Sequence, residues 1–467
     1  MQRCLRAMRA GALALVLLSL GAAPPAWPDE RGSGGSSGGG FLRLEGHGGP
    51  VQGVAVSPDG GRLLTASFDY SVGLWDLETG ALIRWLEGHE AAVNAVAFLP
   101  AGAAGGARAL SGGDDFDVIE WDLATGQPLR RMEGHRGKVF HLAVSPDGRL
   151  AASSGWDGRI GLWPLEGGAV RWLEGHRGPV SEAAFSADGA TLYSASHDGT
   201  IRRWDVATGA MQAVVVEHGF GTNHVVLNEA AGWLAYGAVD GAVRALDLAS
   251  GREIADLTAD RRPILALAPS PDGRFLGVGD GHGYIMVIDT ADWTIARDFR
   301  AAVEGPIWAL AWTRDGARLA AGGIADEAAV WPLSGAGDAL FAERRQFHTP
   351  PSAMSNGERQ FVRKCSVCHT LNPDGERRAG PTLYGIFGRK AGTVEGYRYS
   401  DALRGADIVW NAETIGKLFE LGPDRFTPGS KMPLQRINEL ADRRDLISYL
   451  RRNTGPANGQ DATGGTK

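Results

Sequence analysis

The chain has 467 residues and a formal net charge of −7, and 22% of its residues are charged. Its 68 glycines and 43% hydrophobic content are typical of a turn-rich globular protein and exclude a disordered chain. The length allows two domains and a leader. The charge is uneven, because residues 352–455 hold 17 Lys and Arg against 12 Asp and Glu, a balance of +5, which leaves −12 elsewhere. We expect protein partners and no nucleic acid.

The first 23 residues have the pattern of a secretory signal peptide. Three arginines precede an apolar run at residues 10–20, and small residues follow it. We therefore expect a periplasmic or otherwise exported protein. If the leader is not cleaved, the protein stays close to a membrane. Residues 24–40 are rich in glycine and serine and predict a flexible linker.

Residues 41–333 repeat. Four units open with Gly46-His47, Gly88-His89, Gly134-His135 and Gly175-His176, and they close at Trp75-Asp76, Trp121-Asp122, Trp163-Pro164 and Trp204-Asp205. Three weaker units close at Leu246-Asp247, Ile288-Asp289 and Trp331-Pro332. Closing positions lie 41 to 46 residues apart, close to the period of a four-stranded propeller blade. The repeats resemble the WD40 family, which implies an all-β, seven-bladed propeller.

An aspartate precedes the closing tryptophan of the first four units by six residues, at Asp69, Asp115, Asp157 and Asp198. The resemblance implies that each aspartate hydrogen-bonds the histidine of its own unit. Later units keep Asp240, replace the aspartate by His282, or carry Asp326 out of register, so we expect them to be less rigid or differently braced. Residues 41–44 should form the outer strand of the seventh blade and leave no open edge.

The propeller sequence shows no catalytic motif. His141, His197, His224 and His282 form no recognisable ligand set by spacing, and the acidic run at residues 114–117 contains an expected turn aspartate. We expect this domain to present a rigid surface for binding partners.

The strongest chemical signal follows a predicted linker at residues 334–351. Cys365 and Cys368 lie two residues apart and His369 follows at once, the pattern of covalent attachment of one haem c with a histidine on its iron. The only other cysteine, Cys4, lies in the leader, which excludes structural disulfides and zinc sites in the mature chain. A redox pair like that of thioredoxin is the rival interpretation, and the adjacent histidine disfavours it.

Residues 352–455 are predicted as one domain, and residues 456–467 as a disordered tail. Residues 356–453 resemble class I cytochromes c through the segments Gly380-Pro381-Thr382-Leu383, 387–392, 397–402 and 428–433. The resemblance implies an all-α domain in which Gly357 and Phe361 pack against Leu446 and Tyr449. It further implies that the carbonyl of Pro381 supports His369 and that a haem pocket includes Arg389, Tyr399, Trp410 and Ser430, the first three at the propionates.

The sixth iron ligand is predicted to be Met432. No other methionine, histidine or cysteine follows His369, although His348 in the linker stays a formal alternative. A His/Met iron has a raised potential and no open position. The tyrosine common near the methionine sulfur falls at Leu418 or Phe419, so its hydrogen bond is expected to be missing.

Three functions remain open. The first is one-electron transfer between redox partner proteins that bind the propeller and the haem edge. The second is a haem enzyme, similar to nitrite reductases or peroxidases, with a further site in the propeller. The third is a redox-sensing scaffold. One attachment motif and a filled coordination sphere favour the first.

Overall fold

The structure is a computed structural model, and it describes residues 41–100, 107–257, 263–302, 305–333, 354–365, 369–373, 380–397, 399–428, 430, 432, 436–437 and 439–455. The predicted signal peptide, both linkers and the tail lie outside these residues. Within them, no helix has the length and apolar character needed to cross a membrane.

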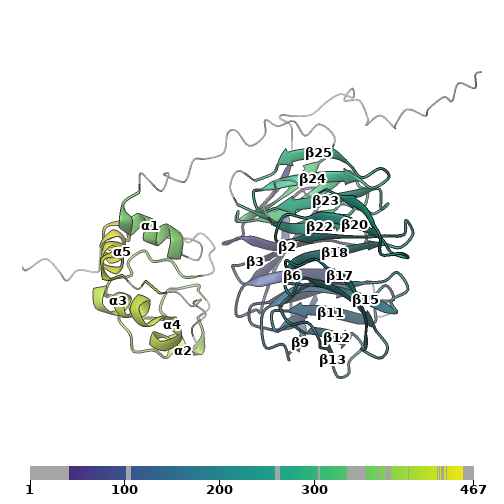
Figure 1. Cartoon of the computed structure of the whole chain (residues 1–467). Helices are drawn as coiled ribbons and strands as arrows, with labels where there is room; N and C mark the ends of the chain where they lie inside the picture. The colour runs from purple at the N-terminus through teal and green to yellow at the C-terminus, as the bar shows by residue number, and fades with distance from the viewer. Residues whose placement is uncertain are drawn as a thin grey trace, which may run out of the picture. The chain divides into compact units, whose positions relative to one another are not determined.

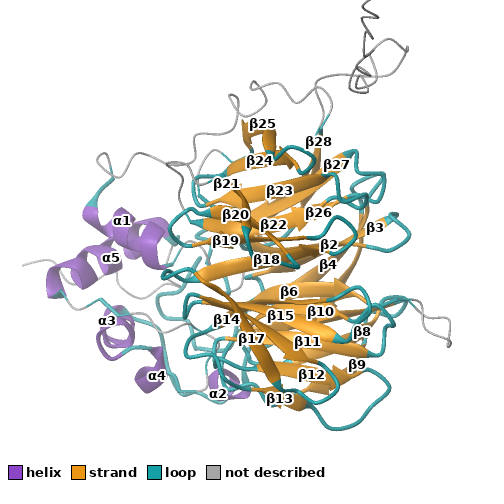
Figure 2. Cartoon of the chain, turned by 45° about the vertical axis from the view of Figure 1, so that its right-hand side comes forward, coloured by secondary structure: helices purple, strands orange, loops and turns teal. Residues whose placement is uncertain are grey.

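The described strands form seven four-stranded antiparallel sheets (Figures 1 and 2). This confirms the seven-bladed propeller. The first three blades contain β2 (Val51–Val56), β3 (Arg62–Ser67), β4 (Ser71–Asp76) and β5 (Leu82–Glu87); β6 (Val93–Phe98), β7 (Arg108–Gly113), β8 (Val118–Asp122) and β9 (Pro128–Met132); and β10 (Val139–Val144), β11 (Leu150–Gly155), β12 (Ile160–Pro164) and β13 (Arg171–Leu173).

The next three blades follow the same order along the chain. They contain β14 (Val180–Phe185), β15 (Thr191–Ser196), β16 (Thr200–Asp205) and β17 (Met211–Glu217); β18 (Thr222–Asn228), β19 (Trp233–Ala238), β20 (Val243–Asp247) and β21 (Glu253–Asp256); and β22 (Ile264–Pro269), β23 (Phe275–Asp280), β24 (Tyr284–Asp289) and β25 (Thr294–Arg300). The first strands of neighbouring blades contact one another in a closed ring.

The seventh blade joins the two ends of the propeller. Its strands β26 (Ile307–Trp312), β27 (Arg318–Gly323) and β28 (Glu327–Pro332) are followed in the sheet by β1 (Leu42–Glu45). Strand β1 pairs antiparallel with β28 from Leu42 opposite Val330 to Glu45 opposite Glu327. The ring of Phe41 stacks on Trp331, with centroids 4.2 Å apart. The predicted outer strand of the seventh blade is thus confirmed.

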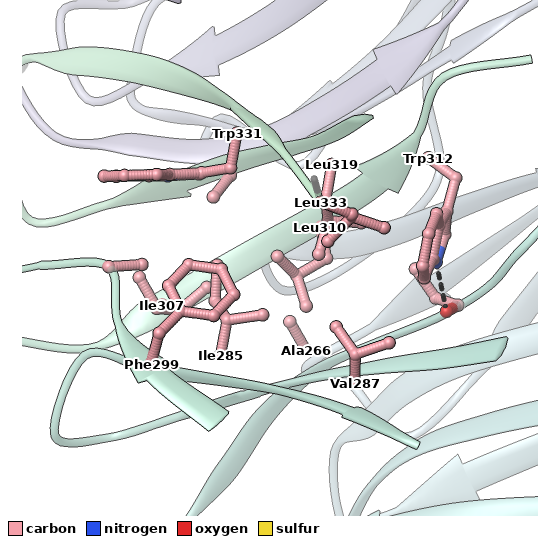
Figure 3. Packing of buried hydrophobic residues seen from close by; sticks show 13 residues of the cluster. Ala266, Ile285, Val287, Phe299, Ile307, Leu310, Trp312, Leu319, Trp331 and Leu333 are labelled. Atoms are coloured by element: carbon pink, nitrogen blue, oxygen red, sulfur yellow. Dashed lines mark hydrogen bonds between the residues drawn. The ribbon is translucent and has the colours of Figure 1, made fainter. Parts of the chain in front are cut away.

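Apolar side chains fill the space between consecutive blades. Figure 3 shows this packing between blades six and seven, where Ile285 and Val287 of one blade meet Ile307 and Leu310 of the next. The Trp312 indole N–H donates to a backbone carbonyl of the sixth blade at 2.8 Å. Each blade therefore depends on its neighbour to bury one face of its sheet.

A buried chain of side-chain hydrogen bonds braces each of the first four blades. In blade one the indole N–H of Trp75 donates to Thr65 Oγ1 at 2.8 Å, and Thr65 lies 2.5 Å from His47 Nε2. The other ring nitrogen, Nδ1, lies 2.9 Å from a carboxylate oxygen of Asp69. The same arrangement occurs in His89–Asp115–Ser111–Trp121, His135–Asp157–Ser153–Trp163 and His176–Asp198–Ser194–Trp204. The predicted His–Asp bonds are confirmed.

Blades five and six use other groups. In blade five Asp240 accepts from His218 Nε2 at 3.0 Å, and the Tyr236 hydroxyl lies 3.2 Å from His218 Nδ1, in place of serine and tryptophan. In blade six Asp280 is 3% exposed and accepts from the backbone N–H groups of His282 and Tyr284. The expectation of different bracing is correct for these two blades.

The C-terminal region holds five helices within its described residues. They are α1 (Asn356–Lys364), α2 (Asp401–Arg404), α3 (Ala412–Leu421), α4 (Pro423–Phe426) and α5 (Leu440–Asn453). Ser355 caps α1, and Asn411 and Thr414 form a reciprocal capping box at the start of α3. The predicted helical cytochrome c fold is confirmed.

Helices α1 and α5 pack closely against each other, as the sequence predicts. The rings of Phe361 and Tyr449 lie 5.6 Å apart, and Leu446 is fully buried beside them. A Cβ atom at Gly357 would lie 2.1 Å from the carbonyl oxygen of Asp445. Only glycine lets the two backbones approach this closely.

We expect Gly357→Ala to lower the free energy of unfolding of this domain by about 1–3 kcal/mol, the cost typical of overpacking. Gly416→Ala is the matched control, because its Cβ would meet only Ile447 Cδ1 at 3.7 Å inside helix α3. That change should be neutral or stabilising by up to about 1 kcal/mol, because alanine favours helix. Denaturant unfolding followed by haem absorbance measures both. Equal midpoints for the two variants would contradict the packing argument.

Candidate functional site

One pocket in the helical domain collects most of the predicted site residues. Its walls are largely apolar, which is typical of pockets that bind organic ligands. Predicted site residues among its lining are Cys365, His369, Pro381, Arg389, Tyr399, Trp410, Ser430 and Met432.

His369 follows helix α1 in the chain and is held by two hydrogen bonds. Its backbone N–H donates to the carbonyl of Cys365 at 2.8 Å, and its ring Nδ1 lies 2.7 Å from the carbonyl oxygen of Pro381. Burial lowers the pKa of His369, against the hydrogen bond to Pro381, so the ring is held neutral. A neutral imidazole whose Nδ1–H donates to a carbonyl keeps Nε2 for a metal. The predicted support from Pro381 is present.

Gly380 packs flat against this ring. A Cβ atom at Gly380 would lie 2.3 Å from Cε1 and 2.8 Å from Nε2 of His369. Any side chain here would have to move the imidazole. The sequence gives Gly380 as part of a motif, but its contact with the histidine emerges only from the structure.

The two predicted attachment cysteines differ in what the structure describes. Cys365 ends helix α1, is 3% exposed and lines the pocket. Cys368 lies outside the described residues, so its position relative to the pocket stays a prediction.

A short backbone ladder brings Arg389 and Trp410 together. The N–H of Trp410 donates to the carbonyl of Arg389 at 2.9 Å, and a β-bridge joins Lys390 to Val409. The Arg389 guanidinium donates to two backbone carbonyls, those of Thr382 and Tyr384, each at 2.7 Å. It thereby ties the segment after Pro381 to the pocket wall.

Tyr399 completes this side of the pocket. It is 9% exposed, and burial raises the pKa of its hydroxyl, which therefore stays protonated and able to donate. Arg389 and Tyr399 are two donors at the pocket, as expected for groups that hold carboxylates. Whether they hold propionates stays a prediction.

A later segment of the chain contributes Ser430 and Met432 to the pocket. Met432 is half-buried and lines the same pocket as His369. Ser430 is held by its backbone N–H, which donates to Thr427 at 3.0 Å, and by its hydroxyl, 3.1 Å from that of Thr427. Leu418 and Phe419 also line the pocket, so the predicted position of the missing tyrosine hydroxyl is apolar.

The residues fit a flat, largely apolar group with a polar edge. Leu383, Ile386, Ile415 and Leu450 supply apolar walls, and Arg389 and Tyr399 supply donors. A buried cysteine and a neutral, oriented histidine lie at one side, with a thioether in the same pocket. These groups fit a covalently bound haem c.

The propeller has no comparable centre among its described residues. No group of three His, Cys, Asp or Glu side chains in the described chain could hold a metal ion. In the acidic run, Asp115 pairs with His89, Asp114 with Lys138, and Asp117 with Arg131, which supports the structural explanation.

Comparison with known proteins separates the two regions. The family description "WD domain, G-beta repeat" matches residues 41–76, 80–122, 126–164 and 167–205, and "Cytochrome c" matches residues 354–454. Cytochrome c from Gibberella zeae is 41% identical over 101 residues, which is 22% of this chain and 94% of that protein. Cytochrome c from Sesamum indicum is 37% identical over 105 residues, again 22% and 94%.

We expect Gly380→Ala to displace the His369 ring, because the added methyl group would overlap it. The variant should lose about 1–3 kcal/mol of unfolding free energy, as overpacked sites do, and its visible spectrum should change. Pro381→Ala keeps the carbonyl that accepts from Nδ1 and serves as the control. Unfolding and absorbance of the purified proteins measure the effect. A Gly380→Ala protein with the native spectrum and stability would show that the close contact is unimportant.

Proposed function

Because residues 354–454 make this chain a member of the cytochrome c family and its N-terminal region carries WD40 repeats, we propose that it is an exported one-electron carrier with a propeller that docks redox partners. Membership of this family implies a covalently bound haem c with its iron. The finer statements, on ligands, partners and location, are argued below from the residues.

The observation that carries the proposal is that His369 and Met432 line one pocket. His369 presents its ring through the bond from Nδ1 to Pro381, and Met432 is the single methionine after it in the sequence. We assign these residues as the two axial ligands, with Cys365 and Cys368 as the attachment points. When bound, the haem supplies a one-electron couple whose potential a thioether ligand raises.

The surrounding side chains have separate tasks in this proposal. Leu418 and Phe419 keep water from the methionine side, because they form an apolar wall there. Arg389 and Tyr399 offer donors to carboxylates at the pocket edge. If His369 and Met432 both held the iron of a bound haem, no coordination position would be left for a substrate, and the group would supply one-electron transfer.

Partner docking is inferred from charge and rigidity. Residues 352–455 carry a balance of +5, so they favour an acidic surface on a redox partner. The propeller is closed by the pairing of β1 with β28, which gives loops that are held on a fixed frame. Such a frame suits a docking module.

We expect Met432→Ala to abolish the near-red absorbance band of methionine-ligated ferric haem and to lower the reduction potential. Absorbance and redox titration of the holoprotein measure both, and iron analysis should give one haem per chain. Met354→Leu is the matched control, because Met354 is a buried methionine of the same domain that does not line the pocket. An unchanged band in Met432→Ala would overturn the ligand assignment. A high-spin spectrum in the native protein would favour the haem enzyme.

Export is tested by removing residues 2–23. In a host with a periplasm and haem-attachment machinery, the native chain should appear in the periplasm with covalent haem, whereas the shortened chain should stay in the cytoplasm without it. Cys4→Ser is the control and should behave as native, because Cys4 precedes the apolar run. Haem staining of fractionated cells measures the outcome. Equal haem content in the shortened cytoplasmic chain would contradict the proposed route.

A further inference from the structure

Three adjacent blades carry ionisable side chains at one equivalent position of the inner ring. Each first strand has a register shift, and the residue just after it is His141 in β10, Glu182 in β14 and His224 in β18. The other four blades have Gly53, Ala95, Ala266 and Ala309 at that position. At this position of the first strand, four blades therefore have glycine or alanine, and only blades three, four and five have an ionisable side chain.

Glu182 is shared between the two histidines. It is 7% exposed, and its Oε2 accepts from His224 Nδ1 at 2.7 Å and from the backbone N–H of Val225 at 3.0 Å. Its Oε1 lies 3.7 Å from His141 Nε2, beyond a hydrogen bond. The carboxylate thus links blade four firmly to blade five and weakly to blade three.

His141 has an incomplete set of partners within the described structure. Its Nδ1 is buried and makes no hydrogen bond, and neither does the hydroxyl of Ser154, which lies opposite on β11. A proton taken up by His141 would therefore add a buried N–H without an acceptor, which opposes protonation in the folded state. It would also draw Glu182 towards Nε2 and away from His224 and Val225.

We propose that His141, Glu182 and His224 form an acid-sensitive latch that holds blades three, four and five together at neutral pH and loosens on acidification. The proposal is independent of the haem. Among the strands packed against the cluster, β6, β11 and β22 have no ionisable residue, and β15 and β19 carry Tyr193 and Tyr236. Strand β7 carries Arg108, and β16 carries Arg202, Arg203 and Asp205. His197 lies in the turn that follows β15.

The direction of the pH effect follows from the surroundings of the cluster. Burial lowers the pKa of His141 and the neighbouring His224 acts in the same sense, against the attraction of Glu182 and the influence of the Ala183 backbone. The unfolded chain, with an ordinary histidine pKa of 6.5, then binds more protons than the folded one. The stabilisation is complete above about pH 6.5 and is lost as the pH falls below it. Glu182, whose pKa is lowered by both histidines against burial, adds a further loss only below its ordinary value of 4.5.

Hydrogen exchange of the full-length holoprotein at pH 7.5 and 5.5, corrected for the intrinsic rates, tests the latch. We expect β10, β14 and β18 to lose protection on acidification by on the order of tenfold more than β2, β22 and β26, because a buried donor without an acceptor is costly. His141→Ala installs the residue type of blades two, six and seven and should remove the excess loss. His141→Gln, which takes up no proton, should do the same if alanine loosens the blade.

His282→Gln, in the turn between β23 and β24 of blade six, is the control and should keep the excess loss. The proposal is overturned if all inner strands lose protection equally. It is also overturned if the excess loss persists in both His141 variants.

Discussion

The propeller depends on a chain of four buried side chains in which every donor meets an acceptor. Tryptophan donates to a hydroxyl, the hydroxyl donates to histidine Nε2, and Nδ1–H donates to an aspartate. Although burial opposes it, the bond from His47 keeps the pKa of Asp69 below its usual range, so the carboxylate stays charged as an acceptor. Because a buried unpaired polar group is costly, removing any member penalises the rest. Four successive blades contain this Trp–hydroxyl–His–Asp chain of hydrogen bonds, which explains why their sequences are so regular.

The same physical rule decides what each histidine can do. In the braced blades both ring nitrogens are occupied by protein groups, so the imidazole is a structural element. His369 instead has Nδ1 at the neutral carbonyl of Pro381, which leaves Nε2 for a ligand outside the protein. His141 is intermediate, since Nε2 lies near a carboxylate at a distance too long for a hydrogen bond and Nδ1 makes none in the described structure. The partners of the ring nitrogens thus distinguish the structural histidines of the first four blades from His369, the proposed iron ligand, and from His141, the histidine of the proposed latch.

Features that follow from a local pattern can be predicted from the sequence. Contacts between residues that lie far apart in the sequence cannot. Repeat spacing predicts seven blades and the return of residues 41–44 to the last sheet, and the resemblance to WD40 repeats adds the His–Asp bonds of the first four blades. The sequence does not predict that the hydroxyls of Thr65 and Ser111 link histidine to tryptophan, because a hydroxyl in a middle strand has no distinctive spacing. The same holds for His218 with Tyr236, and for His141, Glu182 and His224, which lie on different blades. In the helical domain the motifs predict which residues line the pocket, but not that Gly380 lies against His369.

The pairing of β1 with β28 has a consequence for the order of folding. Most sheets of the propeller are built from consecutive strands, so their contacts are local and can form early. The seventh needs Leu42 and Val330, which lie at opposite ends of the repeat region, and closing so long a loop carries an entropy cost. Until that pairing forms, the last blade has an exposed edge that can pair with another chain. Ring closure is therefore the step at which a slowly maturing chain is most exposed to aggregation or strand exchange.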